Sequence, residues 1–220
     1  MYPWRGAGTG AATQGGSRVT QTDSPAGAPG NRREALLDQA GALMAAQGYD
    51  GTSMRDIATA VGMLPGSLYY HFPSKEALFL ALHGRVVAEM EGRVRAALAG
   101  AADPWDRLAA AAGAHLEGLL ATGNLVAIVS PGFLDKRAEI SDEIRAERCR
   151  YEEIFRGLFA ALDLPEGIDR DLLRLHLFGA LNWAPIWFDP DRAARGGADA
   201  RRIAAQAVEV MRRAARGGTR

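Results

Sequence analysis

From residue 31 onward, apolar residues recur every three or four positions, which is the spacing of one face of an α-helix. No stretch shows the strict apolar–polar alternation of a half-buried strand. The pattern predicts an all-α protein. The apolar stripes cover residues 36–44, 57–61, 78–94, 105–119, 144–162, 172–183 and 203–211.

Residues 31–78 predict three helices joined by tight turns. Thr52 or Ser53 is placed to cap the second helix, Gly62 supplies a turn with positive φ, and Pro65 suits the first position of the third helix. Two short helices joined by a glycine turn form a helix-turn-helix, whose second helix can enter a DNA major groove. An ordinary corner between two helices would satisfy the same spacings.

Polar groups cluster on the third predicted helix. Ser67, Tyr69, Tyr70 and His71 carry hydroxyls and an imidazole, which can reach phosphates and base edges. For Tyr69 the alternative is a core position with a satisfied hydroxyl. The helix therefore predicts a surface for reading DNA.

Composition narrows the remaining chemistry. The chain has 26 basic and 26 acidic residues, a balance that disfavours a protein coating nucleic acid indiscriminately. Cys149 is the only cysteine, so neither an intrachain disulfide nor a cysteine-clustered zinc site is expected. The four histidines lack metal-ligand spacing, and the chain has no His-Glu-x-x-His motif, no P-loop and no Gly-x-Ser-x-Gly motif. We expect no metal, no cofactor and no enzymatic activity.

The two ends of the chain differ from its middle. Residues 1–30 are rich in Gly and Pro and predict a flexible arm, either without function or lying along DNA. Residues 216–220 form a basic tail. No apolar run reaches the roughly 20 residues of a membrane span, and no secretory signal is visible, so a cytoplasmic protein is expected.

The order of residues in the predicted head closely resembles the TetR family of bacterial repressors. The matching segments are Thr52–Ala58, Gly62, Gly66–Phe72 and Pro73–Leu78, within residues 31–82. The resemblance implies a homodimeric repressor that a small effector releases from a palindromic operator. It implies a DNA-binding domain at residues 31–78 and a ligand-binding and dimerisation bundle at 79–215.

The resemblance also assigns roles within the head. It implies that Thr52 and Lys75 contact phosphates on either side of the recognition helix. Many family members carry a capping hydroxyl near the position of Leu64. Here Leu64-Pro65 replaces it, so we expect the phosphate contact of that hydroxyl to be absent. The expected DNA-binding residues are Thr52, Arg55, Pro65, Gly66, Ser67, Tyr69, Tyr70, His71 and Lys75.

In this family the last two helices build a four-helix dimer interface. Small residues here would allow those helices to cross closely, and Trp183 can pack at the interface or line a pocket. The expected interface residues are Leu175, Gly179, Trp183, Ile203, Ala207, Val210 and Met211.

Two polar residues fall on apolar stripes of the C-terminal region. Arg148 and His115 are expected to be buried, and a buried guanidinium needs an anion. That anion is an internal carboxylate such as Glu117 or Glu152, or the acidic group of a ligand. The candidate ligand-binding residues are Met90, Trp105, His115, Leu119, Phe133, Arg148, Tyr151, Phe155 and Trp183.

The effector class is suggested by a second resemblance. Residues 62–67, Asn182-Trp183 and 187–190 are similar to regulators of lipid and sterol degradation that sense CoA thioesters. We therefore expect a largely apolar effector, with acyl-CoA among the candidates. Two alternatives stay open: a helical ligand carrier without specific DNA binding, and a redox role for Cys149, which otherwise serves as a packing residue.

Overall fold

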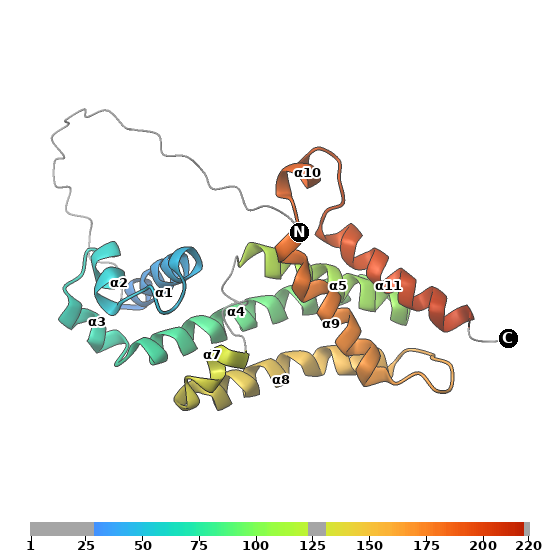
Figure 1. The fold of residues 1–220 in the computed structure, drawn as a ribbon, viewed down its shortest axis with the longest axis horizontal. Helices are drawn as coiled ribbons and strands as arrows, with labels where there is room; N and C mark the ends of the chain where they lie inside the picture. The colour runs from blue at the N-terminus through green and yellow to red at the C-terminus, as the bar shows by residue number, and fades with distance from the viewer. Residues whose placement is uncertain (1–28, 123–130, 218–220) are drawn as a thin grey trace.

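The computed structural model describes residues 29–122 and 131–217, and every regular element in these ranges is a helix (Figure 1). The prediction of an all-α protein is confirmed. The helices are α1 Pro29–Gln47, α2 Met54–Ala60, α3 Pro65–His71, α4 Lys75–Leu98, α5 Pro104–Ala121, α7 Pro131–Asp135, α8 Ala138–Ala160, α9 Arg170–Trp187, α10 Pro190–Ala194 and α11 Ala200–Gly217.

Helices α1, α2 and α3 form a small head at the N-terminal end of α4 (Figure 1). Its core is made by fully buried side chains from all three helices, including Leu36, Met44, Ile57 and Leu68. Helix α1 contacts both α2 and α4, so the head is joined to α4 by packing as well as by the chain.

Helix α4 runs from the head into the larger bundle. Ser74 caps it, because the Ala77 backbone N–H donates to the Ser74 hydroxyl at 3.1 Å. The predicted apolar stripe is buried along the whole length, from Leu78 to Val94. Because α4 contacts α1 at one end and α5 and α8 further along, it mechanically links the head to the bundle.

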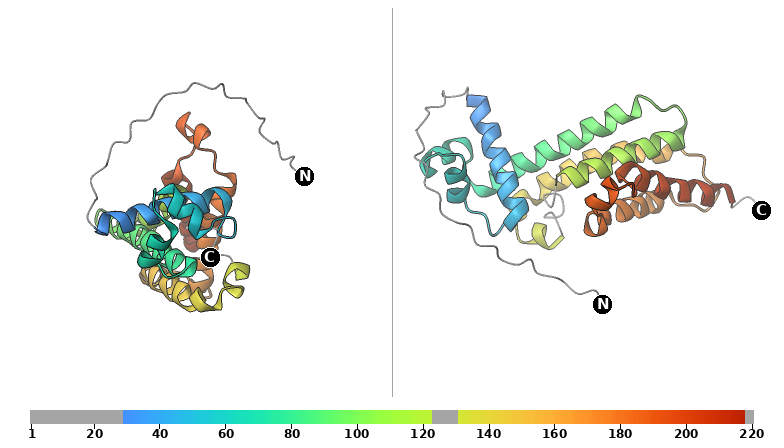
Figure 2. Two further views of the ribbon diagram at one scale, coloured as in Figure 1. Left: turned by 90° about the vertical axis from the view of Figure 1, so that its left-hand side faces the viewer. Right: turned by 90° about the horizontal axis from the view of Figure 1, so that it is seen from above.

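Helix α5 is the centre of the bundle, in contact with α4, α8, α9 and α11. Asp103 caps it by accepting from the backbone N–H groups of Trp105 and Asp106. Ala111 and Ala112 are fully buried, and their small side chains let the surrounding helices approach closely. Figure 2 shows α8 and α9 against α5, with α11 beside them and α10 projecting from the bundle.

Two expectations about boundaries need correction. The expected arm lies outside the described residues except for Pro29 and Gly30, which belong to α1. Of the expected tail, Arg216 and Gly217 belong to α11.

No described helix is long and apolar enough to span a membrane.

The apolar stripe expected on α9 is its outward face. Leu172, Leu175 and Trp183 are exposed, whereas Leu177 and Leu181 are buried. The helix is apolar on two sides, and periodicity alone does not tell which side meets the core.

Candidate nucleic-acid interface and effector site

The head's second helix begins with a reciprocal cap. The Asp56 backbone N–H donates to the Ser53 hydroxyl at 3.1 Å, and the Ser53 backbone N–H donates to an Asp56 carboxylate oxygen at 2.9 Å. The hydrogen bonds from Ser53 hold the pKa of Asp56 below its ordinary value. Of the two predicted caps, Ser53 is therefore the one used.

The turn between α2 and α3 is built around Gly62, which has φ +68° as predicted. The N–H of Met63 donates to the carbonyl of Ala58 at 2.8 Å and so closes the turn. Ala58 is fully buried beneath it. The small residue and the glycine together fix the angle at which α3 leaves α2.

Helix α3 turns its apolar anchor inward and its hydroxyls outward. Leu68 is fully buried, whereas the exposed fractions of Tyr69 and Tyr70 are 52% and 89%. Ser67 is exposed and His71 is half-buried. The core alternative for Tyr69 is wrong, and the polar groups of α3 face solvent as a DNA-reading surface requires.

The start of α3 departs from the usual pattern. Leu64 occupies the N-cap position, where its side chain accepts no hydrogen bond, and Pro65 begins the helix. The missing hydroxyl cap inferred from the sequence is thus observed. The Leu64 side chain is 77% exposed.

Thr52 requires a correction. Its side chain is 1% exposed, and its hydroxyl donates to the carbonyl of Gly48 at 2.9 Å. The hydroxyl therefore closes the corner after α1 and is not free to contact a phosphate. Arg55, another of the predicted DNA-binding residues, is exposed on α2.

A cluster around Tyr49 joins the head to the bundle. Tyr49 is buried, and its hydroxyl donates to a Glu76 carboxylate oxygen at 2.8 Å. The Lys75 Nζ lies 4.1 Å from the centre of its ring, and the Arg137 guanidinium carbon lies 4.4 Å from it. Partial burial lowers the pKa of Lys75. The Tyr49 ring thus contacts both Lys75, which is predicted to bind a DNA phosphate, and Arg137, which immediately precedes α8.

Phe133 belongs to this same cluster. Its ring centre lies 5.2 Å from that of Tyr49 and 5.1 Å from that of Phe79. Arg137 lies over the Phe133 ring and is ion-paired with Asp50 in the head. Phe133 was expected in the ligand pocket; the structure instead places it beneath the head.

A hydrogen-bonded histidine lies at the centre of the bundle. His115 on α5 is 4% exposed, as expected from its place on an apolar stripe. Its Nε2 lies 3.0 Å from the Asn182 amide oxygen, and its Nδ1 lies 2.8 Å from the Tyr151 hydroxyl. Because the amide oxygen only accepts, Nε2 carries the proton and Nδ1 accepts from Tyr151.

Burial keeps this histidine neutral. Removal from water lowers the pKa of His115 to about 4. Burial also raises the pKa of Tyr151, whose hydroxyl therefore remains a donor. The rings of Phe155 and Phe178 lie edge-on to the imidazole, with centres 5.8 and 5.4 Å away. The core thus holds three hydrogen-bonded polar side chains, Asn182, His115 and Tyr151, with aromatic rings packed against the imidazole.

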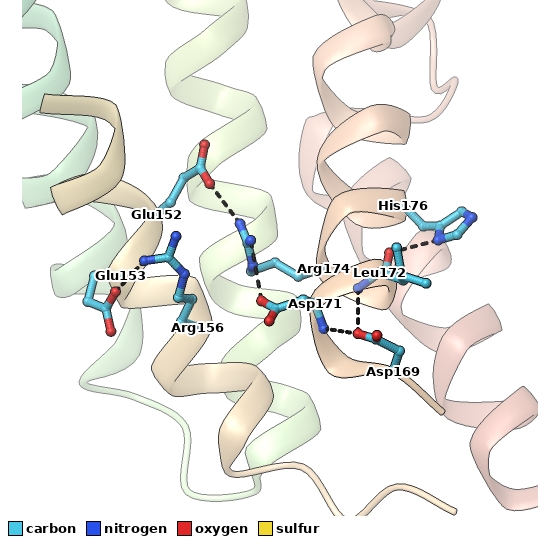
Figure 3. Close-up of polar contacts among 8 residues, drawn as sticks. All are labelled: Glu152, Glu153, Arg156, Asp169, Asp171, Leu172, Arg174 and His176. Atoms are coloured by element: carbon cyan, nitrogen blue, oxygen red, sulfur yellow. Dashed lines mark hydrogen bonds and ion pairs between the residues drawn. The ribbon is translucent and has the colours of Figure 1, made fainter. Parts of the chain in front are cut away.

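Arg174 on α9 is buried in the bundle, as Arg137 is at the start of α8. Arg174 is 6% exposed and donates to Glu152 on α8 at 2.7 Å, with Asp171 at 3.4 Å (Figure 3). Its Nε is buried without a hydrogen-bond partner in the described part of the chain. Arg148 is exposed, so the expectation of a buried guanidinium at that position is wrong.

Other predicted pocket residues are spread through the bundle. Leu119 is buried one turn after His115, and Met90 is buried on α4. Trp105 is buried too, but lies ten residues before His115, about 15 Å along α5. The structure therefore brings together His115, Tyr151 and Phe155 and separates them from Trp105, Arg148 and Phe133.

Three residues of this core were missed by sequence reasoning. Arg174 and Phe178 belong to the inner face of α9, whereas the sequence pattern was assigned to the outer face. Asn182 meets His115 across 67 residues of sequence, a contact that no local spacing reveals. The one signal for Arg174 was its position three residues before the buried Leu177.

Large apolar side chains lie exposed on the outer surface of α9 and α11. The exposed fraction is 64% for Trp183, 53% for Leu175 and 59% for Val210. Ile203, Ala207 and Met211 are half-buried on α11, and Gly179 is exposed on α9. Exposed apolar side chains that share one surface are typical of an interaction surface.

Two family models match the chain. The model described as "Bacterial regulatory proteins, tetR family" matches residues 36–82, and "Tetracyclin repressor-like, C-terminal domain" matches residues 101–215. The first spans the head and the start of α4, and the second spans most of the bundle.

Known relatives agree with these matches. The HTH-type transcriptional repressor KstR2 of Rhodococcus jostii is 38% identical over 143 residues, which are 63% of this chain and 68% of that protein. The crystal structure of AibR with isovaleryl coenzyme A and operator DNA is 26% identical, with TM-score 0.69, covering 81% of this chain and 97% of AibR. The TetR family regulator PfmR of Thermus thermophilus is 26% identical, with TM-score 0.66, covering 84% of this chain and 99% of PfmR.

Proposed function

This chain belongs to the TetR family of transcriptional regulators, and from that premise we propose that it is a repressor released from a palindromic operator by a CoA thioester. Residues 31–78 act as the DNA-binding domain and residues 79–215 as the ligand-binding and dimerisation domain. The observation that carries the proposal is the construction of α3, which is anchored by Leu68 and presents Ser67, Tyr69 and Tyr70 to solvent.

The exposed face of α3 supports contact with DNA in the major groove. Ser67 and His71 serve as base readers, while Tyr69 and Tyr70 contact backbone, sugar or base. Arg55 and Lys75 flank the helix and contact phosphates, with the backbone at Pro65 and Gly66 approaching closely. Few cations are involved, so affinity depends on two heads acting together and on base contacts.

Two heads are brought together by the apolar face of α9 and α11. Leu175, Trp183 and Val210 lose their solvent exposure when a second copy covers them. A C₂ dimer of this kind presents two recognition helices to successive major grooves, about 34–36 Å apart. The operator is therefore an inverted repeat.

The effector binds in the bundle beside His115. The core there combines aromatic walls with polar atoms of His115, Tyr151 and Asn182, which can be re-paired by a polar group of a ligand. Leu119 and Phe155 supply apolar contacts in the same region. The likeness to AibR, described as a complex with isovaleryl coenzyme A, supports a CoA thioester as the chemical class.

Effector binding reaches the head through α4. His83 on α4 is bonded to Glu147 on α8 at 2.6 Å, so displacement of α8 is passed to α4. The Tyr49 cluster gives a second route, because Arg137 next to α8 contacts a ring that also contacts Lys75. A tilt of α4 alters the separation of the two recognition helices without altering either helix.

Operator release by CoA thioesters tests the proposal. DNA from upstream of the gene is titrated by fluorescence anisotropy in the presence of isovaleryl-CoA, longer acyl-CoAs, a steroid-acid CoA, free CoA and the free acids. A thioester is expected to weaken operator binding about 5- to 150-fold, the usual range of allosteric coupling. Specific DNA binding without release by any thioester would overturn the effector class alone; absence of specific DNA binding would overturn the repressor.

A further inference from the structure

The head exposes an apolar side chain that its fold does not need. Leu64 is 77% exposed, whereas Leu68, one turn later, is fully buried and anchors α3 without it. The other large apolar side chains exposed on the described head are Tyr69 and Tyr70, which carry hydroxyls. Leu64 is therefore the large exposed side chain of the described reading surface that carries no polar atom.

Its place in the helix makes the exposure more unusual. Leu64 is the N-cap residue of α3, where hydroxyl or amide side chains usually accept a backbone N–H. The leucine accepts none, and most of its apolar side chain stays exposed to solvent.

DNA offers one apolar group at the edge of its bases. The N-terminal residues of a recognition helix contact base edges in the major groove, and Leu64 directly precedes that helix. In this groove thymine alone among the four bases presents a methyl group, which projects from C5, whereas cytosine carries only a hydrogen at C5. A leucine side chain is complementary to the methyl and to none of the polar edges.

We propose that Leu64 reads the 5-methyl group of one thymine in each operator half-site. The inference rests on the proposed DNA-binding function and adds a specificity-determining residue to it. Ser67, His71 and the tyrosine hydroxyls supply the hydrogen bonds, and Leu64 supplies discrimination against cytosine at one position. The chemistry recognised is a 5-methylpyrimidine, so 5-methylcytosine presents the same group.

Replacement of thymine by uracil removes this methyl and leaves base pairing unchanged. The full-length chain first selects duplexes from a pool with a random core of about 30 base pairs, long enough for two half-sites about one helical turn apart. Each thymine of the selected duplex is then changed to uracil, in symmetric pairs, and affinities are measured by fluorescence anisotropy for the wild type and for Leu64→Ala.

One thymine position is expected to stand out. Loss of one buried methyl corresponds to about fourfold per half-site, or about 15-fold for the symmetric pair. Leu64→Ala should bind the thymine duplex about as weakly as the wild type binds the uracil duplex. Its affinity should not change when uracil replaces thymine at that one position, and it should keep the wild-type response at the others. Leu64→Met, which stays apolar, should retain the methyl dependence. A cytosine at that position should regain affinity when it is 5-methylated.

The possible failures are distinguishable. Equal uracil penalties in the wild type and Leu64→Ala, or no methyl-dependent position, would overturn the role of Leu64 while DNA binding stands. Failure of the selection to enrich any sequence would overturn the proposed function itself. Circular dichroism of Leu64→Ala should match the wild type, because the side chain is exposed.

Discussion

The head exposes its polar functional groups to solvent, whereas the bundle buries its polar groups and exposes apolar ones. In α3 the buried side chain is an ordinary leucine, Leu68, and the polar chemistry faces solvent. In the bundle His115 and Arg174 are buried, and the outer face of α9 is apolar. Substitutions of the exposed α3 residues should therefore change recognition at constant stability, whereas substitutions of the buried polar residues or of the apolar outer face in the bundle should change stability or assembly.

The largest effect is expected where the bundle's apolar face meets a second copy. Trp183→Glu places a charge on that face, and Trp183 is exposed enough for the single chain to remain folded. Separate heads lose the avidity of two linked sites, so operator affinity should fall about 10²- to 10⁴-fold.

Sedimentation and anisotropy measure the two consequences together. Trp183→Glu should sediment as a monomer, while the control Ala146→Glu, which adds the same charge at an exposed position on α8, should remain dimeric. A Trp183→Glu protein that stays dimeric with full operator affinity would place the interface elsewhere.

The buried ion pair comes next. Glu152→Ala leaves Arg174 buried with only the more distant Asp171, which should cost about 3 kcal/mol of unfolding free energy. For a chain of this size that corresponds to a fall in Tm of about 6–12 °C.

Calorimetry checks this cost against a matched control. Arg148→Ala removes an exposed arginine from the same helix as Glu152, and its Tm should equal that of the wild type. The assignment of Arg174 as the structural arginine fails if Arg148→Ala is the more damaging change.

Acid should destabilise the bundle through His115. Its pKa is about 4 in the folded chain and 6.5 in the unfolded chain, so the unfolded state binds the proton first as pH falls. The contribution of neutral His115 to the free energy of unfolding is fully present above about pH 6.5 and declines as the pH falls toward 4. At pH 5 the loss is about 2 kcal/mol.

Urea unfolding at neutral and mildly acidic pH, about 7 and about 5, isolates this contribution. His115→Gln lacks the titrating group, so its loss of stability between the two conditions should be about 2 kcal/mol smaller than that of the wild type. Identical pH dependence in the two proteins would show that His115 is not buried in the neutral form.

The smallest effect concerns the head alone. Tyr70→Ala should weaken operator binding about tenfold, since a specific base contact is worth about 1–3 kcal/mol, and should leave Tm unchanged because the side chain is 89% exposed. Tyr70→Phe separates the hydroxyl from the ring. Unchanged operator affinity in Tyr70→Ala would remove this residue from the interface.

The same contrast explains what the sequence could predict. In the head the decisive contacts are local: the cap between Ser53 and Asp56 spans three residues, and the turn at Gly62 depends on one backbone conformation. Residue type and short spacing therefore predicted the three helices and the outward face of α3. Thr52 was misplaced because a hydroxyl at a helix corner serves equally well to close the corner or to bind a phosphate.

In the bundle the decisive contacts are long-range. His115 meets Tyr151 and Asn182 across 36 and 67 residues, and Arg174 meets Glu152 on another helix. A stripe shows that a helix has an apolar face, but tertiary packing decides which face of α9 turns inward. The sequence indicated that His115 is buried and offered Glu152, along with Glu117 or a ligand, as the partner of a buried guanidinium, but it assigned that guanidinium to Arg148, whereas Glu152 pairs with Arg174.

The number of chains on the selected operator tests the central claim most directly: two copies of the head must be held at a fixed separation. Analytical ultracentrifugation of the full-length protein on the selected duplex gives this number, and the selected sequence gives the symmetry. The account predicts an inverted repeat with half-site centres about one helical turn apart and an even number of chains per duplex. A single chain on a sequence without internal symmetry would contradict it.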